Sequence, residues 1–226
     1  GYFLMSGGNR EDREKFIELA KFYSRSLRRT ANRKNPPLIR KPQNQTPALT
    51  AIEPRRSILI QAMLTEIGIE MGFSIWVPKA DKKRVLDATQ AKYHAAFLDE
   101  LPLNYDDATL DTIAQIDVLW LKNKSIVRAF EVEHTTAVYS GLLRMADLLA
   151  LQPNMDIRLH IVAPDNRRKK VFRDMLRPVF CLLDRGPLAR SCTFIAYSNI
   201  NAITRLEHLS HLKDGILEKY EEQAGP

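Results

Sequence analysis

Three acidic residues interrupt two otherwise apolar stretches of the chain. Asp117 lies within IDVLWL, and Glu131 and Glu133 lie near the end of SIVRAFEVE. Both stretches are rich in β-branched and aromatic residues, which is typical of strands. Because successive side chains of a strand point to opposite faces, Glu131 and Glu133 share one face. If the two stretches pair as a hairpin, Asp117 comes near Glu131, and three carboxylates converge at one end of a sheet.

Three neighbouring carboxylates repel one another unless a cation neutralises them. Oxygen ligands of this kind suit a hard divalent cation such as Mg²⁺, or Mn²⁺ in its place. The cation can position water and polarise a phosphodiester, while a remaining carboxylate accepts a proton from the attacking water. The alternative is that the Glu-x-Glu pattern forms an ordinary polar strand face. The acids interrupt strongly apolar stretches, which favours the metal or catalytic role.

Helices and strands alternate along the part of the chain that must position these acids. In chain order the pattern predicts a helix at 55–71 ended by Gly72, a strand at 73–77, a short helix near 89–98, strands at 116–121 and 125–133 joined by a tight turn, a helix at 135–152, a strand at 157–163, a helix at 167–180, a strand at 192–198 and a helix at 201–220. The helix between two strands predicts a parallel crossover. The expected fold is therefore α/β, with a mixed central sheet flanked by helices.

The excess positive charge lies at the start of the chain. The first 50 residues contain 11 of the 34 Lys and Arg but only 4 of the 27 Asp and Glu, so they carry the whole formal net charge of +7. A helix is expected at 11–30, and the four prolines of 32–50 predict a linker. We therefore expect a basic helical arm and Pro-rich linker at 1–50 and one domain at 51–226. Charge alone is equally consistent with an arm that binds nucleic acid and with a solvated tail.

The composition is that of an ordinary globular protein, with 45% hydrophobic and 27% charged residues. No apolar run approaches the roughly 18 residues that a membrane-spanning helix needs, so no membrane partner is expected. The two cysteines, Cys181 and Cys192, have no metal-ligand spacing and favour a reducing compartment, so a cytoplasmic location is expected. No glycine-rich phosphate loop is present, which disfavours nucleotide binding of the P-loop type.

A basic stretch opens the helix expected at 167–180. Its basic residues are Arg167, Arg168, Lys169, Lys170, Arg173 and Arg177. Bases at a helix N-terminus oppose the helix dipole, which a bound phosphate would relieve, although a solvated charged face is equally consistent. Asp165 or Asn166 is expected to cap this helix. Arg144, amid apolar neighbours in GLLRMADL, fits either a phosphate contact or a pair with Asp147.

The acidic pattern resembles a known nuclease superfamily. The sequence ID-x-x-W, followed 14 residues after the aspartate by E-V-E, resembles the PD-(D/E)xK nucleases, in the Glu-x-Glu variant of a minority of restriction endonucleases. The resemblance implies a restriction-endonuclease-like core over 55–163, with Asp117 and Glu131 as metal ligands. It also implies that the Val132 carbonyl faces the metal and that Glu66, in the first apolar helix, supplies a further acid.

Glu133 stands where that superfamily usually has a lysine. The resemblance implies three outcomes, which the sequence leaves open. Glu133 is the base that activates water, or the site is inactive, or a lysine comes from elsewhere, such as Lys79 or Lys82.

The resemblance implies a metal-dependent endonuclease that hydrolyses DNA phosphodiester bonds, as a restriction or defence enzyme. Asp117, Glu131 and Glu133 would be its catalytic acids, and Arg144 and the basic stretch would contact DNA. Because related enzymes often use two active sites for the two DNA strands, a homodimer is expected. The alternative is a catalytically inactive nuclease-fold module that binds nucleic acid or a partner protein. A third interpretation is a structural domain whose acids bind nothing, and the choice between DNA and RNA stays open.

Overall fold

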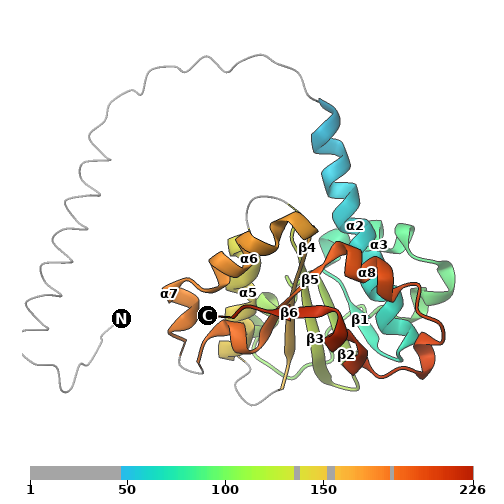
Figure 1. Cartoon of the computed structure of the whole chain (residues 1–226). Helices are drawn as coiled ribbons and strands as arrows, with labels where there is room; N and C mark the ends of the chain where they lie inside the picture. Colours follow the sequence, from blue (N-terminus) through green and yellow to red (C-terminus); the bar gives the residue numbers. More distant parts are fainter. Residues whose placement is uncertain (1–46, 135–137, 152–155, 184–185, 226) are drawn as a thin grey trace, which may run out of the picture. The chain divides into compact units, whose positions relative to one another are not determined.

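A computed structural model of the chain describes residues 47–134, 138–151, 156–183 and 186–225 (Figure 1). The helix expected at 11–30 and nearly all of the expected linker lie outside the described residues. Helix α2 (Pro47–Glu70) begins within the last residues of that expected linker, eight residues earlier than the apolar pattern predicts. It ends at Glu70, and the predicted terminator Gly72 follows with a φ of 83°, a conformation that glycine readily adopts.

Six strands form one mixed sheet in the order β1-β2-β3-β4-β5-β6. They are β1 (Ser74–Trp76), β2 (Val118–Lys122), β3 (Ser125–Val132), β4 (Arg158–Ala163), β5 (Cys192–Ala196) and β6 (Glu221–Gln223). The β3–β4 and β4–β5 pairs are parallel, and the other three pairs are antiparallel. The predicted hairpin, the predicted parallel crossover and the mixed α/β sheet are therefore confirmed.

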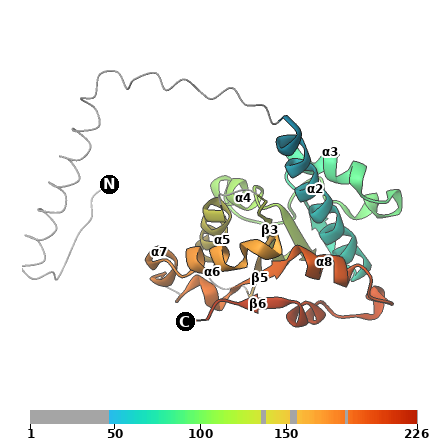
Figure 2. The same ribbon diagram turned by 45° about the horizontal axis from the view of Figure 1, so that its top comes forward.

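Helices cover both faces of this sheet (Figures 1 and 2). One apolar core joins one sheet face to α4 (Asp107–Ile113), α5 (Val138–Leu151) and α6 (Arg168–Met175). A second core joins the opposite face to α2 and α8 (Tyr197–Ile203). No helix in the described part of the chain is long and apolar enough to span a bilayer.

The close approach of α2 to the sheet depends on Gly68. The Trp120 indole of β2 is fully buried, and its Nε1 donates a hydrogen bond of 3.1 Å to the Leu64 carbonyl of α2. A Cβ at Gly68 would lie 2.6 Å from Trp120 Nε1 and 2.9 Å from Ile75 Cδ1. The missing side chain therefore lets the helix pack directly on the indole.

The β2–β3 hairpin sets the relative positions of the acids. It turns at Asn123, whose φ is 57°, and Lys122 pairs with Ser125 on either side of the turn. The register then shifts between Trp120 and Leu121, as in a β-bulge, so that Val118 pairs with Phe130. Continuing that register by one residue places Asp117 opposite Glu131.

The sequence pattern misses two helices, a helix break and the absence of a cap. Residues 78–113 contain α3 (Lys79–Ala88) and α4 beside a 3₁₀ helix at 91–96. The helix expected at 167–180 stops at Met175 and resumes as α7 (Pro178–Cys181), because the residue before a proline disfavours the helical conformation. Neither expected cap forms on α6, since the Asp165 carboxylate instead accepts hydrogen bonds from Ser198.

The C-terminal segment is also not the single helix expected at 201–220. Helix α8 ends at Ile203, and His208 adopts a left-handed conformation with φ of 61° that interrupts helical continuation. Two 3₁₀ turns and strand β6 follow.

Candidate active site

The three acids lie together at one edge of the sheet. Strands β1, β3, β4 and β5 run in the same direction, so their carboxyl ends and the start of β2 meet at this edge. Asp117 directly precedes β2, Glu131 belongs to β3 and Glu133 follows it. Their side chains share the face that packs on α5, because their alternate neighbours Leu119 and Ala129 belong to that core.

Each carboxylate has a defined partner. Asp117 Oδ2 accepts a hydrogen bond of 2.7 Å from the Val132 N–H. Both Glu131 oxygens accept from the Arg144 guanidinium of α5, with Nε to Oε1 at 2.7 Å and Nη2 to Oε2 as the second contact. Glu133 Oε1 accepts from the Gly141 N–H of α5 at 3.2 Å. Helix α5 therefore holds both glutamates, and a main-chain group of β3 holds the aspartate.

Burial makes ionisation of these acids costly. Burial raises the pKa of Asp117 to about 6, although the Val132 N–H and the Arg144 charge act in the opposite direction. Burial and the negative charge of Asp117 raise the pKa of Glu133 to about 7. Burial also raises the pKa of Glu131, which is 0% exposed, against the hydrogen bonds from Arg144. A further cation at this edge would relieve that cost.

The atoms available to a metal ion at this edge are oxygens, which are the ligands that a hard cation prefers. Among the described residues, no group of three or more His, Cys, Asp or Glu side chains is arranged to hold a metal ion. Mg²⁺, however, typically binds one or two carboxylates and keeps several water ligands. Asp117 and Glu131 supply two carboxylates. The Val132 carbonyl points to the β2 side, as does the Val132 N–H that meets Asp117. These three groups would hold the ion.

Comparison with known proteins shows the family. The type II restriction enzyme NmeDI C-terminal domain family matches residues 37–224. The chain belongs to this NmeDI C-terminal domain family. The type II restriction enzyme NmeDI of Neisseria meningitidis serogroup C is 36% identical over 140 residues, which cover 58% of this chain and 39% of that relative. The chain thus spans less than half the length of that relative, and no solved structure matches it.

One expected metal ligand, Glu66, lies apart from Asp117 and Glu131 in this NmeDI-family chain. It lies on α2, which packs on the opposite face of the sheet from Asp117 and Glu131. Its Oε1 accepts a hydrogen bond of 3.0 Å from the Gln90 N–H. The structure therefore does not bring Glu66 together with the other acids.

The opposite side of the β3 end carries a second polar group. The His134 ring stacks on Tyr197 with 6.1 Å between ring centroids, and the Tyr197 hydroxyl donates to the Glu133 carbonyl at 3.3 Å. The His134 Nδ1 is buried without a hydrogen-bond partner among the described residues. These contacts fix the main chain that carries Glu133.

Helix α6 presents its basic residues beside the acidic edge. Arg168, Lys169 and Arg173 are exposed, and Arg167 is half-buried. Lys170 donates to Asp174 at 2.6 Å, and its charge also lowers the pKa of Glu133, so it lies on the side of the acids. The expected basic stretch is thus largely exposed, and two of its members pair within the chain, Arg168 with Glu222 and Arg173 with Asp174.

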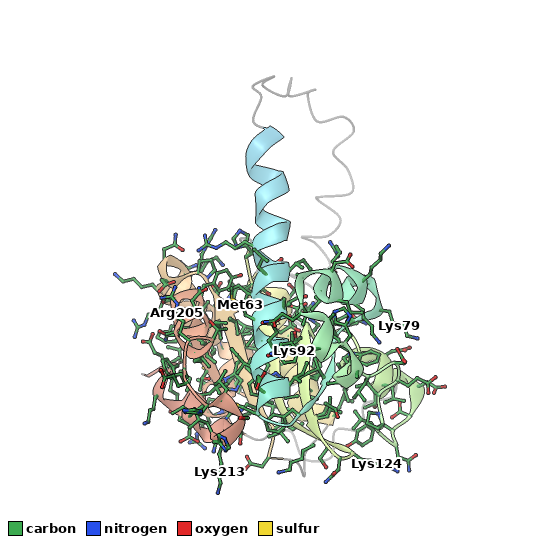
Figure 3. The ribbon with its side chains drawn as sticks, turned by 90° about the vertical axis from the view of Figure 1, so that its right-hand side faces the viewer. Met63, Lys79, Lys92, Lys124, Arg205 and Lys213 are labelled. Atoms are coloured by element: carbon green, nitrogen blue, oxygen red, sulfur yellow. The ribbon has the colours of Figure 1, made fainter. Side chains whose placement is uncertain are left out.

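Helix α3 lies on the other side of the acids, which the sequence pattern did not predict. The charge of Asp81 in this helix acts to raise the pKa of Asp117. Lys82 donates to the Leu98 carbonyl and to Asp99, so it is engaged away from the three acids. In Figure 3, Lys79 at the start of α3 lies above Lys124 of the β2–β3 turn.

Gly141 is the residue of the site that the sequence analysis missed. A Cβ at this position would lie 2.5 Å from Glu133 Oε1 and 3.3 Å from both Glu131 Cβ and Oε2. Only a residue without a side chain lets α5 approach both glutamates this closely. The sequence carries no signal for it beyond a glycine inside an apolar helix pattern.

We predict that Gly141→Ala lowers DNA cleavage while leaving the stability of the fold almost unchanged. Alanine favours a helix interior by roughly 0.5–1 kcal/mol over glycine, and the Glu133 carboxylate can move away from the added methyl group. The variant should therefore fold with an unfolding free energy close to that of the wild type, while DNA cleavage falls because Glu133 is displaced. Urea denaturation and plasmid cleavage, measured on the same preparation, test this. Unchanged cleavage would show that the position of Glu133 is unimportant.

Proposed function

We propose that this chain is the nuclease part of a type II restriction enzyme, a metal-dependent endonuclease that hydrolyses DNA phosphodiester bonds in restriction or defence. The observation that carries the proposal is that Asp117 and Glu131 lie close enough to interact, one residue beyond the paired Val118 and Phe130, in a chain of the NmeDI family. The order of helices and strands supports a restriction-endonuclease-like core of the PD-(D/E)xK type with Glu-x-Glu.

The chain's own residues divide the chemistry between them. A bound Mg²⁺ or Mn²⁺ supplies Lewis-acid stabilisation of the charge that develops on the phosphate oxygens. Asp117, Glu131 and the Val132 carbonyl would hold the ion. Glu133, whose pKa is raised by burial to about 7, accepts a proton from the attacking water. The Gly141 N–H orients Glu133 for that transfer.

DNA is positioned by positive charge beside the acids. The exposed residues Arg168, Lys169 and Arg173 of α6 contact backbone phosphates, together with Arg167 and Lys170 at the same helix. Such contacts release condensed counterions and fix the position of the duplex without reading its sequence. Because each duplex has two strands to cut, the working assembly is expected to be a homodimer.

Cleavage of supercoiled plasmid and bacteriophage DNA by the purified chain tests the proposal. Nicked or linear products should form with Mg²⁺ or Mn²⁺ and should disappear when EDTA is added. Cleavage that persists in EDTA, or no cleavage of any DNA with either ion, would contradict it. A structured RNA as a parallel substrate decides between the two nucleic acids.

A catalytically inactive binding module is the second candidate. The observation that favours it is the Arg144 guanidinium, which engages both oxygens of Glu131. This candidate requires tight DNA binding without cleavage, and no uptake of Mn²⁺ by calorimetry.

We predict that the stability of the chain depends on pH through the acids. Asp117 and Glu133 hold their protons more tightly in the folded chain, with pKa values of about 6 and 7, than in the unfolded chain, where carboxyl values are about 4. The folded chain therefore binds more protons over this range. The contribution of these two groups to the free energy of unfolding therefore falls as the pH rises from about 4 to 7.

The Asp117→Asn/Glu133→Gln double variant isolates this contribution. Thermal unfolding from pH 5 to pH 8 should show a variant whose Tm rises relative to the wild type as pH increases. Added Mn²⁺ should offset the difference, because a ligand bound only to the folded state stabilises it. A Tm difference that is constant with pH would contradict the prediction.

A further inference from the structure

We propose that Arg144 is the resident counter-cation of the acidic site: it occupies Glu131 in the metal-free chain and moves to a DNA phosphate when a divalent cation takes its place. The inference rests on the proposed function, since it concerns the same site. It goes further, because it assigns one residue to couple metal binding with DNA binding.

The contact between Arg144 and Glu131 uses the carboxylate oxygens that a metal ion would also bind. Glu131 is 0% exposed, and both of its oxygens face the planar guanidinium of Arg144. A cation that uses the same oxygen lone pairs must displace that guanidinium.

The charges at this edge favour such an exchange. Arg144 pairs directly with Glu131, and its charge also acts on Asp117 and Glu133. The charge of Lys170 reaches Glu133 as well. A divalent cation carries one more positive charge than Arg144, so it neutralises the three acids better. The exchange also releases an arginine whose side chain is 29% exposed and reaches the surface.

Helix α5 fixes where the released arginine acts. Gly141 and Arg144 are three residues apart, so they lie on the same helix face, and they contact the two glutamates in turn. The guanidinium therefore stays beside the acids after it leaves Glu131. Its planar array of donors matches the oxygens of a phosphate. The released Arg144 side chain can therefore contact a phosphate that binds beside the acids.

The proposal predicts positive coupling between metal and DNA. DNA that captures Arg144 removes the competitor of the metal, and metal that displaces Arg144 supplies a phosphate ligand. By thermodynamic linkage each must strengthen the binding of the other by the same factor. In the absence of DNA, Arg144 weakens metal binding.

Calorimetric titration of the full chain with Mn²⁺ at pH 8, with and without DNA, tests the proposal. Without DNA, Arg144→Met should bind Mn²⁺ at least about fivefold more tightly than the wild type, while its DNA cleavage falls. DNA should tighten Mn²⁺ binding in the wild type but not in Arg144→Met. Arg144→Lys, which keeps the charge, should lie between the two. To prevent turnover, these titrations use a phosphorothioate duplex.

Arg158→Gln is the matched control. Arg158 pairs with Glu218 at the start of β4, at the opposite edge of the sheet, so its loss should leave the Mn²⁺ affinity unchanged. Equal or weaker Mn²⁺ binding by a folded Arg144→Met, checked by circular dichroism, would overturn the inference. If Arg144→Met does not fold, unchanged coupling in Arg144→Lys would overturn it. The proposed function fails separately, when the wild type itself neither binds Mn²⁺ nor cuts DNA.

Discussion

Asp117→Asn should lower the rate of DNA cleavage at least about a thousandfold, since a bound metal contributes several kcal/mol to the transition state and each 1.36 kcal/mol changes the rate tenfold. The asparagine oxygen can still accept the Val132 N–H that Asp117 now accepts at 2.7 Å. The fold should therefore survive, while the site loses one negative metal ligand. Single-turnover cleavage of plasmid DNA measures the effect.

Glu207→Gln serves as the control for this substitution. Glu207 is an exposed acid in the C-terminal segment, so the variant should cut at the wild-type rate. Circular dichroism and thermal unfolding establish that Asp117→Asn remains folded. A folded Asp117→Asn protein that cuts within tenfold of the control would remove Asp117 from the metal site.

Arg128→Met should lower the free energy of unfolding by about 3–5 kcal/mol, because it breaks a buried ionic network by removing one partner. Arg128 of β3 is 0% exposed. It donates to Asp214 Oδ2 and to the Asp214 carbonyl, both at 2.9 Å, and its Nη1 lies 3.0 Å from His160 Nε2. His160 Nδ1 in turn lies 3.2 Å from Glu221 of β6. The network therefore ties the C-terminal segment to the centre of the sheet.

Urea denaturation compares this variant with Arg158→Gln. Arg158 forms an exposed pair with Glu218, which is expected to contribute less than about 1 kcal/mol. A cost for Arg128→Met that is no larger than the cost for Arg158→Gln would show that the buried network does not stabilise the fold. Arg128 lies four residues from the end of β3, away from the acidic edge, so the folded fraction of the variant should still cleave DNA.

The sequence predicts the centre of the sheet because strong local signals define it. IDVLWL and SIVRAFEVE are apolar runs on either side of a short turn, and their hairpin forms at Asn123 as expected. The apolar strand at 158–163 and the helix before it give the parallel crossover. These elements depend on patterns of neighbouring residues, which a sequence shows directly.

The juxtaposition of Asp117 and Glu131 depends on a feature that the sequence does not show. The pairing of Lys122 with Ser125, continued without a shift, would place Asp117 opposite Phe130 and on the wrong face. The register shift between Trp120 and Leu121 moves the partner by one residue, to Glu131. Bulges of this kind are decided by packing across the sheet, so the sequence supports the convergence of the acids only as a hypothesis.

Other misses have the same origin in long-range packing. The sequence left two possible partners for Arg144, a phosphate and Asp147. In the structure its partner is Glu131, because the core beneath α5 sets the rotation of that helix. Helix α3 buries only Val85, so its apolar signal is weak. Strand β6 is three polar residues at the edge of the sheet and shows no alternation.

The central claim is that Asp117, Glu131 and the Val132 carbonyl bind a divalent cation in exchange for Arg144. Anomalous diffraction from crystals of the chain soaked in Mn²⁺ tests it directly. The account predicts a peak between the Asp117 and Glu131 carboxylates, with the Arg144 guanidinium withdrawn from Glu131. An empty edge at saturating Mn²⁺, with Arg144 still paired to both Glu131 oxygens, would contradict it.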